Sequence, residues 1–218
     1  MIRSFHDRMT EAVFQGRCPR GFPADLFKVA RRKLRALHNA VDLKDLKAPP
    51  SNRLHALIGD RAGQLAISVS DQFRIVFVWT DAGPERVELT DYHLAKEGSV
   101  MSDTISITTL RQTFEAEEDV VRLAPLHPGE VLREEFMVPL KLSAGSVAKA
   151  LGLPRSRIER IVKEEIGIST DTALRLARYF GTSHQFWLNL QADFESETLL
   201  SEIGPELDRI EPLPAVAA

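Results

Sequence analysis

Residues 143–162 read SAGSVAKALGLPRSRIERIV, and this stretch decides the fold of the second half of the chain. Apolar residues recur at helical spacing in both parts of it, and the small Ala148 lets one helix cross the other closely. Gly152 tolerates the left-handed backbone of a sharp helix exit. Pro154 suits the first turn of the next helix, where its missing N–H is not needed. The stretch therefore predicts a helix-turn-helix.

The outward face of the second predicted helix is basic. Between residues 143 and 163, five basic side chains face one acidic side chain, Glu159, which gives a net charge of +4. The planar fork of arginine suits guanine edges and phosphates, so we interpret this helix as a reader of the DNA major groove. The alternative is a solvated basic helix in an ordinary bundle. The DNA-binding candidates are Lys149, Arg155, Ser156, Arg157, Arg160 and Lys163.

Length and composition indicate a globular protein. The chain of 218 residues is long enough for one large or two small domains, and 44% of its residues are hydrophobic and 27% charged. It has no apolar run of the roughly 20 residues that span a bilayer, and its start, MIRSFHDRMT, is unlike a signal peptide. The single cysteine, Cys18, excludes an intrachain disulfide. We expect a cytoplasmic protein without a membrane partner.

The two halves of the chain carry opposite charge. Residues 1–100 contain 16 Lys and Arg against 12 Asp and Glu, a net charge of +4, whereas residues 101–218 contain 12 against 19, a net charge of −7. A cationic first half is typical of a protein that binds RNA or phosphate. The opposite signs also suggest that the two halves attract each other.

The first half reads as helices followed by strands. A long helix starts at Asp25, and after Pro49 and Pro50 come four strand candidates, at residues 53–58, 65–70, 73–80 and 86–92. This order predicts an α+β domain with an antiparallel sheet. One face of the long helix is basic and could bind RNA phosphates, although a solvated helix face is an equally good interpretation. The RNA-binding candidates are Arg31, Arg32, Lys33 and Arg35.

Polar residues interrupt the predicted strands at chemically useful positions. His55 lies inside an apolar strand, Arg74 begins the next long strand, and Asp91, Tyr92 and His93 close the last one. These residue types exchange protons or donate to a phosphate. The sequence lacks zinc-ligand spacings, a phosphate-binding glycine loop and a GxSxG elbow, so we expect no metal and no cofactor. That lack disfavours a single-domain metabolic enzyme.

These motifs resemble a known family. Arg53-Leu54-His55, Gly59-Asp60, the strand with Arg74 and the closing Asp91-Tyr92-His93 are similar to the HigB branch of RelE-like toxins, over residues 1–93. Such toxins are ribosome-dependent endoribonucleases that cut mRNA in the ribosomal A site. By position, the resemblance makes His55, Asp91, Tyr92 and His93 active-site candidates and Arg74 a phosphate contact. Relatives often carry a lysine where this chain has Ile58. The loss of that positive charge would weaken the stabilisation of a phosphorane.

The residues fit metal-free cleavage of RNA. This reaction uses the neighbouring 2′-OH as nucleophile and needs a base, an acid for the leaving 5′-oxygen, and cations for the added phosphorane charge. His55 and His93 can act as acid and base near neutral pH, and Asp91 is either a base or the group that orients a histidine. Tyr92 can stack on a nucleobase. The acid and the base are not assigned individually.

Residues 126–195 resemble the HigA antitoxin of the XRE/Cro-repressor-like class, from His127-Pro128-Gly129-Glu130 through the helix-turn-helix. The resemblance implies a homodimer that binds a palindromic operator and represses its own promoter. We predict a toxin domain at residues 1–94, a linker and acidic antitoxin segment at 95–125, a helix-turn-helix domain at 126–200, and a tail at 201–218. We predict that residues 104–121, or their acidic run of Glu115, Glu117, Glu118 and Asp119, cover the cationic surface of the toxin domain.

Two questions stay open at this point. Met101-Ser102-Asp103 has the form of a fresh translation start, and such toxins and antitoxins are usually encoded by separate adjacent genes. A natural fusion, an engineered tether and two products written as one chain are all compatible with the sequence. The favoured function is a toxin–antitoxin polypeptide with ribosome, mRNA and operator DNA as partners. The alternative is a DNA-binding autoregulator whose RelE-like half is inactive, as Ile58 and the covalent tether would suggest.

Overall fold

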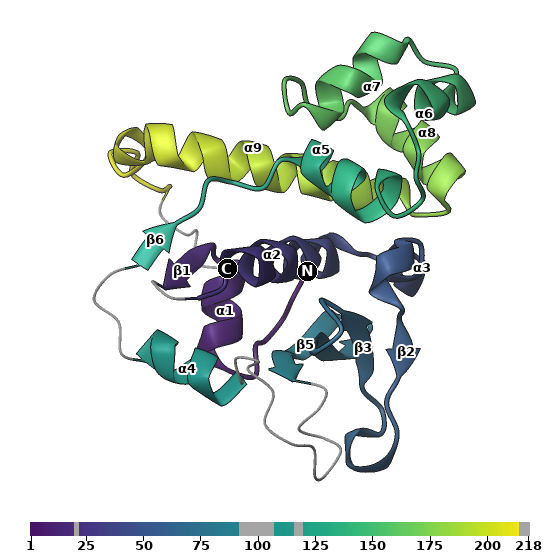
Figure 1. The fold of residues 1–218 in the computed structure, drawn as a ribbon. Coiled ribbons are helices and arrows are strands. Elements are labelled where there is room, and N and C mark those ends of the chain that lie inside the picture. Colours follow the sequence, from purple (N-terminus) through teal and green to yellow (C-terminus); the bar gives the residue numbers. More distant parts are fainter. Residues whose placement is uncertain (20–21, 92–106, 116–119, 214–218) are drawn as a thin grey trace.

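The computed structural model describes residues 1–19, 22–91, 107–115 and 120–213. An α/β part made by the first residues lies below a helical part in Figure 1, and the long helix α9 lies over α2. The predicted α+β class, with an antiparallel sheet followed by a helical helix-turn-helix region, is confirmed.

The first part combines short helices with one antiparallel sheet. Its helices are α1 (Arg8–Phe14), α2 (Ala24–Asn39) and α3 (Leu43–Lys47), with 3-10 turns η1 (Pro50–Asn52) and η2 (Gly59–Arg61). The sheet has the order β2-β3-β4-β5, with β2 (His55–Ala56), β3 (Leu65–Ser68), β4 (Phe73–Thr80) and β5 (Gly83–Asp91). Each strand pairs antiparallel with the next, as a meander requires.

All four predicted strands of the first part form, although three of them have other bounds than predicted. β4 has the bounds predicted for it, whereas the strand predicted at residues 53–58 shrinks to β2. The reason is local, because Arg53 has a left-handed backbone (φ 47°) and the chain turns again at Gly59 (φ 66°). Near the N-terminus, Phe5 forms an isolated parallel bridge with Val87 of β5.

The core of the first part lies between α2 and the inner face of the sheet. Phe27, Leu34 and Leu37 of α2 are fully buried, and they pack with alternate residues of β3, β4 and β5. Each such side chain contributes about 1.5–3 kcal/mol on burial. Successive strand residues point to opposite faces, so the residues between the core positions face outward from the sheet. The core side chains contributed by the sheet are Ile67, Phe73, Ile75, Phe77, Val87 and Leu89.

The second part is helical. Its elements are α4 (Ile107–Glu115), β6 (Val120–Arg122), α5 (Pro128–Val131), the wide π-type turn η4 (Leu132–Met137), α6 (Ala144–Leu151), α7 (Arg155–Val162), α8 (Thr170–Phe180) and α9 (His184–Leu207). Phe136, Trp187 and Ile161 are fully buried in a separate core, with the Phe136 and Trp187 ring centroids 5.1 Å apart.

The predicted helix-turn-helix is confirmed in α6 and α7. Gly152 ends α6 in the left-handed conformation (φ 64°), as the sequence predicts. Pro154 is the N-cap of α7 rather than a residue of its first turn, so α7 begins one residue later, at Arg155. α9 continues through Pro205 to Leu207, which makes part of the segment predicted as a tail helical.

Two segments between the parts pack onto the first part. β6 pairs antiparallel with β1 (Arg17–Pro19). Leu110 of α4 is buried in the core of the first part, and Leu123 packs against the same core. The acidic run predicted to contact the toxin domain cannot be placed, because residues 116–119 and the side chain of Glu115 lie outside the described residues. None of the described helices is long and apolar enough to cross a bilayer.

Gly129 supplies a test of how closely α5 and α7 pack. A Cβ at Gly129 would lie 1.9 Å from the backbone oxygen of Ile161, which cannot move without shifting α7. We expect Gly129→Ala to lower the free energy of unfolding by about 3 kcal/mol or more. Gly145→Ala in α6 is the control, since the nearest atom to its added Cβ lies 3.7 Å away, an ordinary contact, and we expect it to gain about 0.5–1 kcal/mol. Urea denaturation of both variants measures the difference, and equal stabilities would contradict this packing.

Candidate functional site

The outer face of the sheet carries two of the predicted catalytic residues. Strand register aligns His55 with Ala66, Ala66 with Val76 and Val76 with Glu88, in one row across all four strands. Arg74 lies two residues along from Val76 and therefore on the same face. The His55 side chain is exposed, and its Nδ1 lies 2.8 Å from the carbonyl oxygen of Arg53. The structure therefore brings His55 and Arg74 to one surface.

Asp91, another of the predicted catalytic residues, is the last residue of β5. Asp91 is buried at the end of this strand and its Oδ2 accepts a hydrogen bond of 2.6 Å from Gln72 Nε2. The Arg74 guanidinium donates to the carbonyl oxygens of Phe73 (2.9 Å) and Ser70, which hold it at the turn before β4. Tyr92 and His93 lie outside the described residues, so their predicted roles stay predictions.

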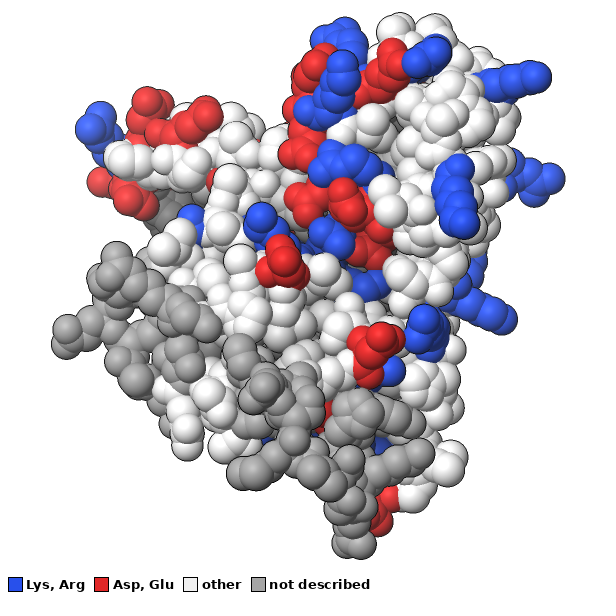
Figure 2. Space-filling view, viewed as in Figure 1, with Lys and Arg blue, Asp and Glu red and all other residues white. Residues whose placement is uncertain are grey.

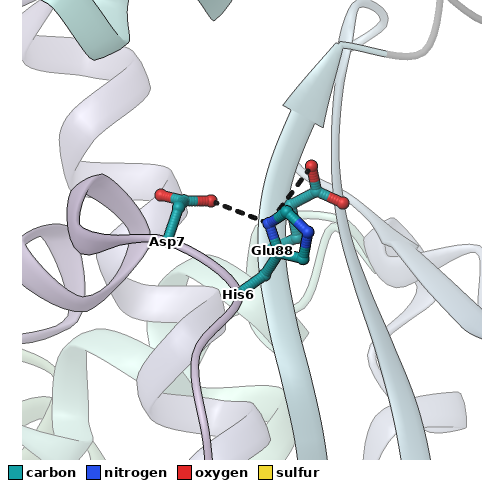
Figure 3. Close-up of side chains that lie close together, drawn as sticks. All are labelled: His6, Asp7 and Glu88. Carbon is teal, nitrogen blue, oxygen red and sulfur yellow. Dashed lines mark ion pairs between the residues drawn. The ribbon is translucent and has the colours of Figure 1, made fainter.

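A cluster that the sequence reading did not single out lies at the edge of this face. His6 Nδ1 is 3.8 Å from Asp7 Oδ2 and 3.9 Å from Glu88 Oε1, as Figure 3 shows. The atoms of these three residues that could bind a metal ion, one from each side chain, lie within 4.8 Å of one another. Both carboxylates already pair with arginine. Arg61 Nη1 lies 2.9 Å from Glu88 Oε2, and Arg111 Nη2 lies 3.0 Å from Glu88 Oε1.

Arg111 belongs to α4, so this cluster also holds the second half of the chain against the first. Arg111 Nη2 lies 3.5 Å from Asp7 Oδ2 and also contacts Glu88. The neighbouring Leu110 is buried in the hydrophobic core of the first part. Asp7 additionally caps α1, because its side chain accepts a hydrogen bond from Thr10 N. The cluster therefore acts as an ion-pair site that joins α4, α1 and β5.

The four predicted RNA-binding cations of α2 are buried in this structure. Only 3% of Lys33 is exposed, and its three neighbours are similarly covered by the helical part. A phosphate backbone cannot reach these side chains while the two parts are in contact. The cationic face of α2 is thus the surface on which the helical part lies (Figure 1). The four residues are Arg31, Arg32, Lys33 and Arg35.

Glu135 of η4 is the centre of this contact, and only 2% of it is exposed. Its Oε1 accepts from Arg32 Nε at 2.6 Å, and its Oε2 accepts from Lys33 Nζ at 2.7 Å. Lys33 Nζ also donates to Asn52 Oδ1 (2.7 Å), and Ser51 Oγ donates to Glu135 Oε2 (3.0 Å). All the charges of this cluster therefore have partners, as burial requires.

The ionisation of Glu135 depends on these cations. Burial alone would raise the pKa of its carboxyl group, but the charges of Lys33 and Arg32 and their hydrogen bonds outweigh burial and lower the pKa below its ordinary value. Glu135 is therefore ionised near neutral pH. Removal of Glu135 would leave the charges of Arg32 and Lys33 buried without their acceptor, which would lower the free energy of unfolding.

Further contacts extend along α2. Arg35 pairs with Glu197 and lies 3.8 Å from Asp193 of α9, and Arg32 Nη1 lies 3.0 Å from Glu130 Oε1. At the far end, Ser183 donates from both its N (2.6 Å) and its Oγ (2.8 Å) to the carboxylate of Asp45. These acidic residues are scattered in the sequence, and only packing brings them together. The sequence showed the opposite charges of the two halves, but the acidic run that it singled out lies outside the described side chains, so that prediction is not tested. The helical part supplies Glu130, Glu135, Asp193 and Glu197.

The predicted DNA-binding residues lie on and beside α7. Arg155, its first residue, has a side chain that is 74% exposed, and its Nε lies 2.7 Å from Glu159 Oε1. Arg157 pairs with Asp171 of α8 at 3.2 Å. Figure 2 shows Lys and Arg side chains projecting from this side of the helical part. Exposed pairs of this kind contribute about 0–1 kcal/mol, so a phosphate or base edge can replace the carboxylates. Lys149, Ser156, Arg160 and Lys163 are exposed there too.

Family models match both halves of the chain. The model described as "RelE-like toxin of type II toxin-antitoxin system HigB" matches residues 3–93, and the model "Helix-turn-helix" matches residues 132–187. The chain therefore belongs to the HigB family of RelE-like toxins through its first part, which is joined to a helix-turn-helix domain.

Individual proteins match one half each. Virulence-associated protein I of Dichelobacter nodosus is 56% identical over 32% of this chain. The match covers 65% of that relative, just under two thirds of its length. Toxin HigB-1 of Vibrio cholerae is 33% identical over 37% of this chain and 86% of its own length. Endoribonuclease HigB of Proteus vulgaris is 29% identical over 43% of this chain and 100% of its own length. A structure of Pseudomonas aeruginosa antitoxin HigA with the higBA promoter shares 44% identity, covering 41% of this chain and 98% of that chain, with a TM-score of 0.40.

The buried Glu135 cluster predicts a pH-dependent stability. We expect Glu135→Ala to lower the free energy of unfolding at pH 7 by about 3–5 kcal/mol, because Arg32 and Lys33 lose their shared acceptor. The folded-state pKa of Glu135 is lowered, so its contribution is present above the unfolded-state pKa and is lost as the pH falls through the folded-state value. The difference between wild type and variant should therefore shrink in acid. Urea denaturation across pH measures it, with the exposed Glu206→Ala as control.

Proposed function

We propose that the chain is a toxin–antitoxin polypeptide in which the first part is a ribosome-dependent mRNA endoribonuclease and the second part silences it and binds DNA. The observation that carries this proposal is the burial of the cationic α2 face against Glu130, Glu135, Asp193 and Glu197. The matches to Toxin HigB-1 and Endoribonuclease HigB support the assignment of a nuclease. Ribosomes and DNA as partners imply a location in the cytoplasm.

The outer sheet face suits the chemistry of RNA cleavage. A base removes the proton of the 2′-OH, O2′ attacks the adjacent phosphorus, and the 5′-oxygen leaves with a proton from an acid, which yields a cyclic phosphate. His55 is exposed and able to exchange a proton, and Arg74 on the same face carries charge for the phosphorane. Asp91 pairs with the core residue Phe73 and therefore faces the other side of the sheet, so we propose that it supports the site from the end of β5, with Tyr92 and His93 as further residues.

Silencing acts on the cations of α2 in this proposal. The helical part buries side chains that would otherwise attract RNA or ribosomal phosphates, and His55 remains exposed. In this proposal, the helical part inhibits the toxin by blocking the surface that binds RNA or ribosomal phosphates, and it needs no contact with His55. The ion pairs of Arg111 with Asp7 and Glu88 add a second contact, at the edge of the catalytic face.

One observation favours a different function for the first part. Ile58 is 90% exposed, so the loop before Gly59 offers an apolar side chain where relatives often carry a lysine. If this change abolishes catalysis, the chain is a DNA-binding autoregulator whose RelE-like half serves only as a folded module. The nuclease assay below separates the two functions.

For DNA, we propose that α7 enters the major groove and that two copies of the chain bind a palindromic operator to repress their own promoter. Recognition helices must then lie about 34 Å apart, one turn of DNA. The homodimer would form through the helical part, where Leu174 and Tyr179 of α8 expose large apolar surfaces. The match to the helix-turn-helix family supports this proposal.

Release of the first part should unmask its nuclease. Glu135→Lys places a cation against Arg32 and Lys33, so we expect the two parts to separate and the chain to cut mRNA on programmed ribosomes. Growth should arrest on expression, and adding His55→Ala should restore it. Glu202→Lys, an exposed carboxylate of α9, is the charge-matched control. Hydrogen exchange of α2 amides verifies the opening. An opened chain that leaves mRNA intact would support the autoregulator instead.

The DNA reader is tested by gel shift on the promoter region that precedes the coding sequence. We expect Arg155→Ala or Arg157→Ala to abolish retention of the operator while the melting temperature stays unchanged, since both side chains lie on the surface of the helical part. Arg209→Ala, an exposed arginine outside the helix-turn-helix, should bind like the wild type. Normal retention by the α7 variants would refute the assignment of the reader helix.

A further inference from the structure

Arg61 reaches across the outer face of the sheet. It is the last residue of η2, in the connection between β2 and β3, yet its Nη1 lies 2.9 Å from Glu88 Oε2 on β5. The strand order β2-β3-β4-β5 places β3 and β4 between the connection and that carboxylate. The η2 turn must therefore lean over the outer face for its arginine to make this contact.

The Arg61 charge lies beside the proposed RNA-cleavage residues. Glu88 pairs with Val76, and Arg74 is two residues along β4 on the same face, so Glu88 and Arg74 are diagonal neighbours. His55 shares the cross-strand row of Glu88. Because Glu88 pairs with Arg61, it holds the Arg61 guanidinium on this face, near the guanidinium of Arg74. Side chains from three strands and one turn thus converge on one surface.

The environment of the pair suits a phosphate contact. Glu88 is 7% exposed, and a buried carboxylate of this kind fixes its cation in one position. The Arg61 side chain is still 39% exposed, and its fork of five donors can serve Glu88 on one edge and a phosphate on another. Ser68, which pairs with Arg74 on this face, is buried with a hydroxyl that has no hydrogen-bond partner among the described residues.

We propose that Arg61 is a further phosphate-contacting residue of the RNA-cleavage face, which supplies the positive charge that Ile58 lacks, and that Glu88 is its positioning residue. This inference rests on the proposed nuclease function. Ile58 lies three residues before Arg61 in the same connection, so both positions belong to one loop over the site. In the joined chain Arg111 of α4 takes the other oxygen of Glu88, and departure of α4 leaves the carboxylate to Arg61.

The test uses the full chain opened by Glu135→Lys, with cleavage measured on mRNA-programmed ribosomes. We expect Arg61→Ala to slow cleavage about 100-fold, as loss of one charge-stabilising donor does, and Arg61→Lys to recover part of the rate. Arg8→Ala, an exposed arginine of α1, should cleave like its parent. Glu88→Gln should also slow cleavage, but Glu88→Gln combined with Arg61→Ala should be no slower than Arg61→Ala alone. Cleavage by Arg61→Ala at the parental rate would overturn the proposal.

A binding assay separates this inference from the nuclease itself. The probe is a short single-stranded RNA with 2′-O-methyl groups, which binds without being cut. Arg61→Ala should reduce the slope of log affinity against log salt by about 0.7, the loss of one phosphate contact. If the opened parent cuts nothing but this slope falls, the nuclease proposal fails and the phosphate contact stands. An unchanged slope in a variant with an unchanged melting temperature refutes Arg61 as a phosphate contact, whatever the parent cleaves.

Discussion

The carboxylate of Glu135 between Arg32 and Lys33 is the interaction on which the arrangement of the two parts depends. Glu135 Oε1 lies 2.6 Å from Arg32 Nε, and Glu135 Oε2 lies 2.7 Å from Lys33 Nζ. All three charged groups are buried, and each would be costly to bury without the others. The π-type turn η4 carries Glu135 to this position between α5 and the helix-turn-helix. The same contact fixes where the helical part lies and which surface of the toxin part it removes from solvent.

This constraint links the two proposed activities in one molecule. The cations of α2 that are proposed to attract RNA are the ones that the second part covers, while α7 keeps its own basic face exposed on another side. The segments before α5 strengthen the contact through strand pairing of β6 with β1 and through Leu110 and Arg111 of α4. Silencing in this account needs no contact with His55, because it withholds the surface that attracts phosphate.

Local patterns in the sequence predicted local structure well, and long-range contacts poorly. β4, α8 and the helix-turn-helix follow from apolar spacing, Ser169 as a cap and glycine at helix ends, all encoded within about ten residues. The pairing of β1 with β6 and the contact of Arg111 in α4 with Asp7 join residues about 100 positions apart, and no local signal marks them. The RNA-binding prediction for α2 stays a prediction, because the structure pairs these cations with acidic residues of the helical part. Arg61 was missed because its importance comes from strand register rather than from a motif.

A double-mutant cycle on Lys33 and Glu135 tests the central claim most directly. The free energy of unfolding is measured for the wild type, Lys33→Met, Glu135→Gln and the double variant. If the buried pair holds the two parts together, each single change strands a charged partner, and the double variant loses less than the sum of the singles by more than about 1 kcal/mol. Additivity within about 0.3–0.5 kcal/mol would show that the two side chains do not interact energetically, and would contradict the account.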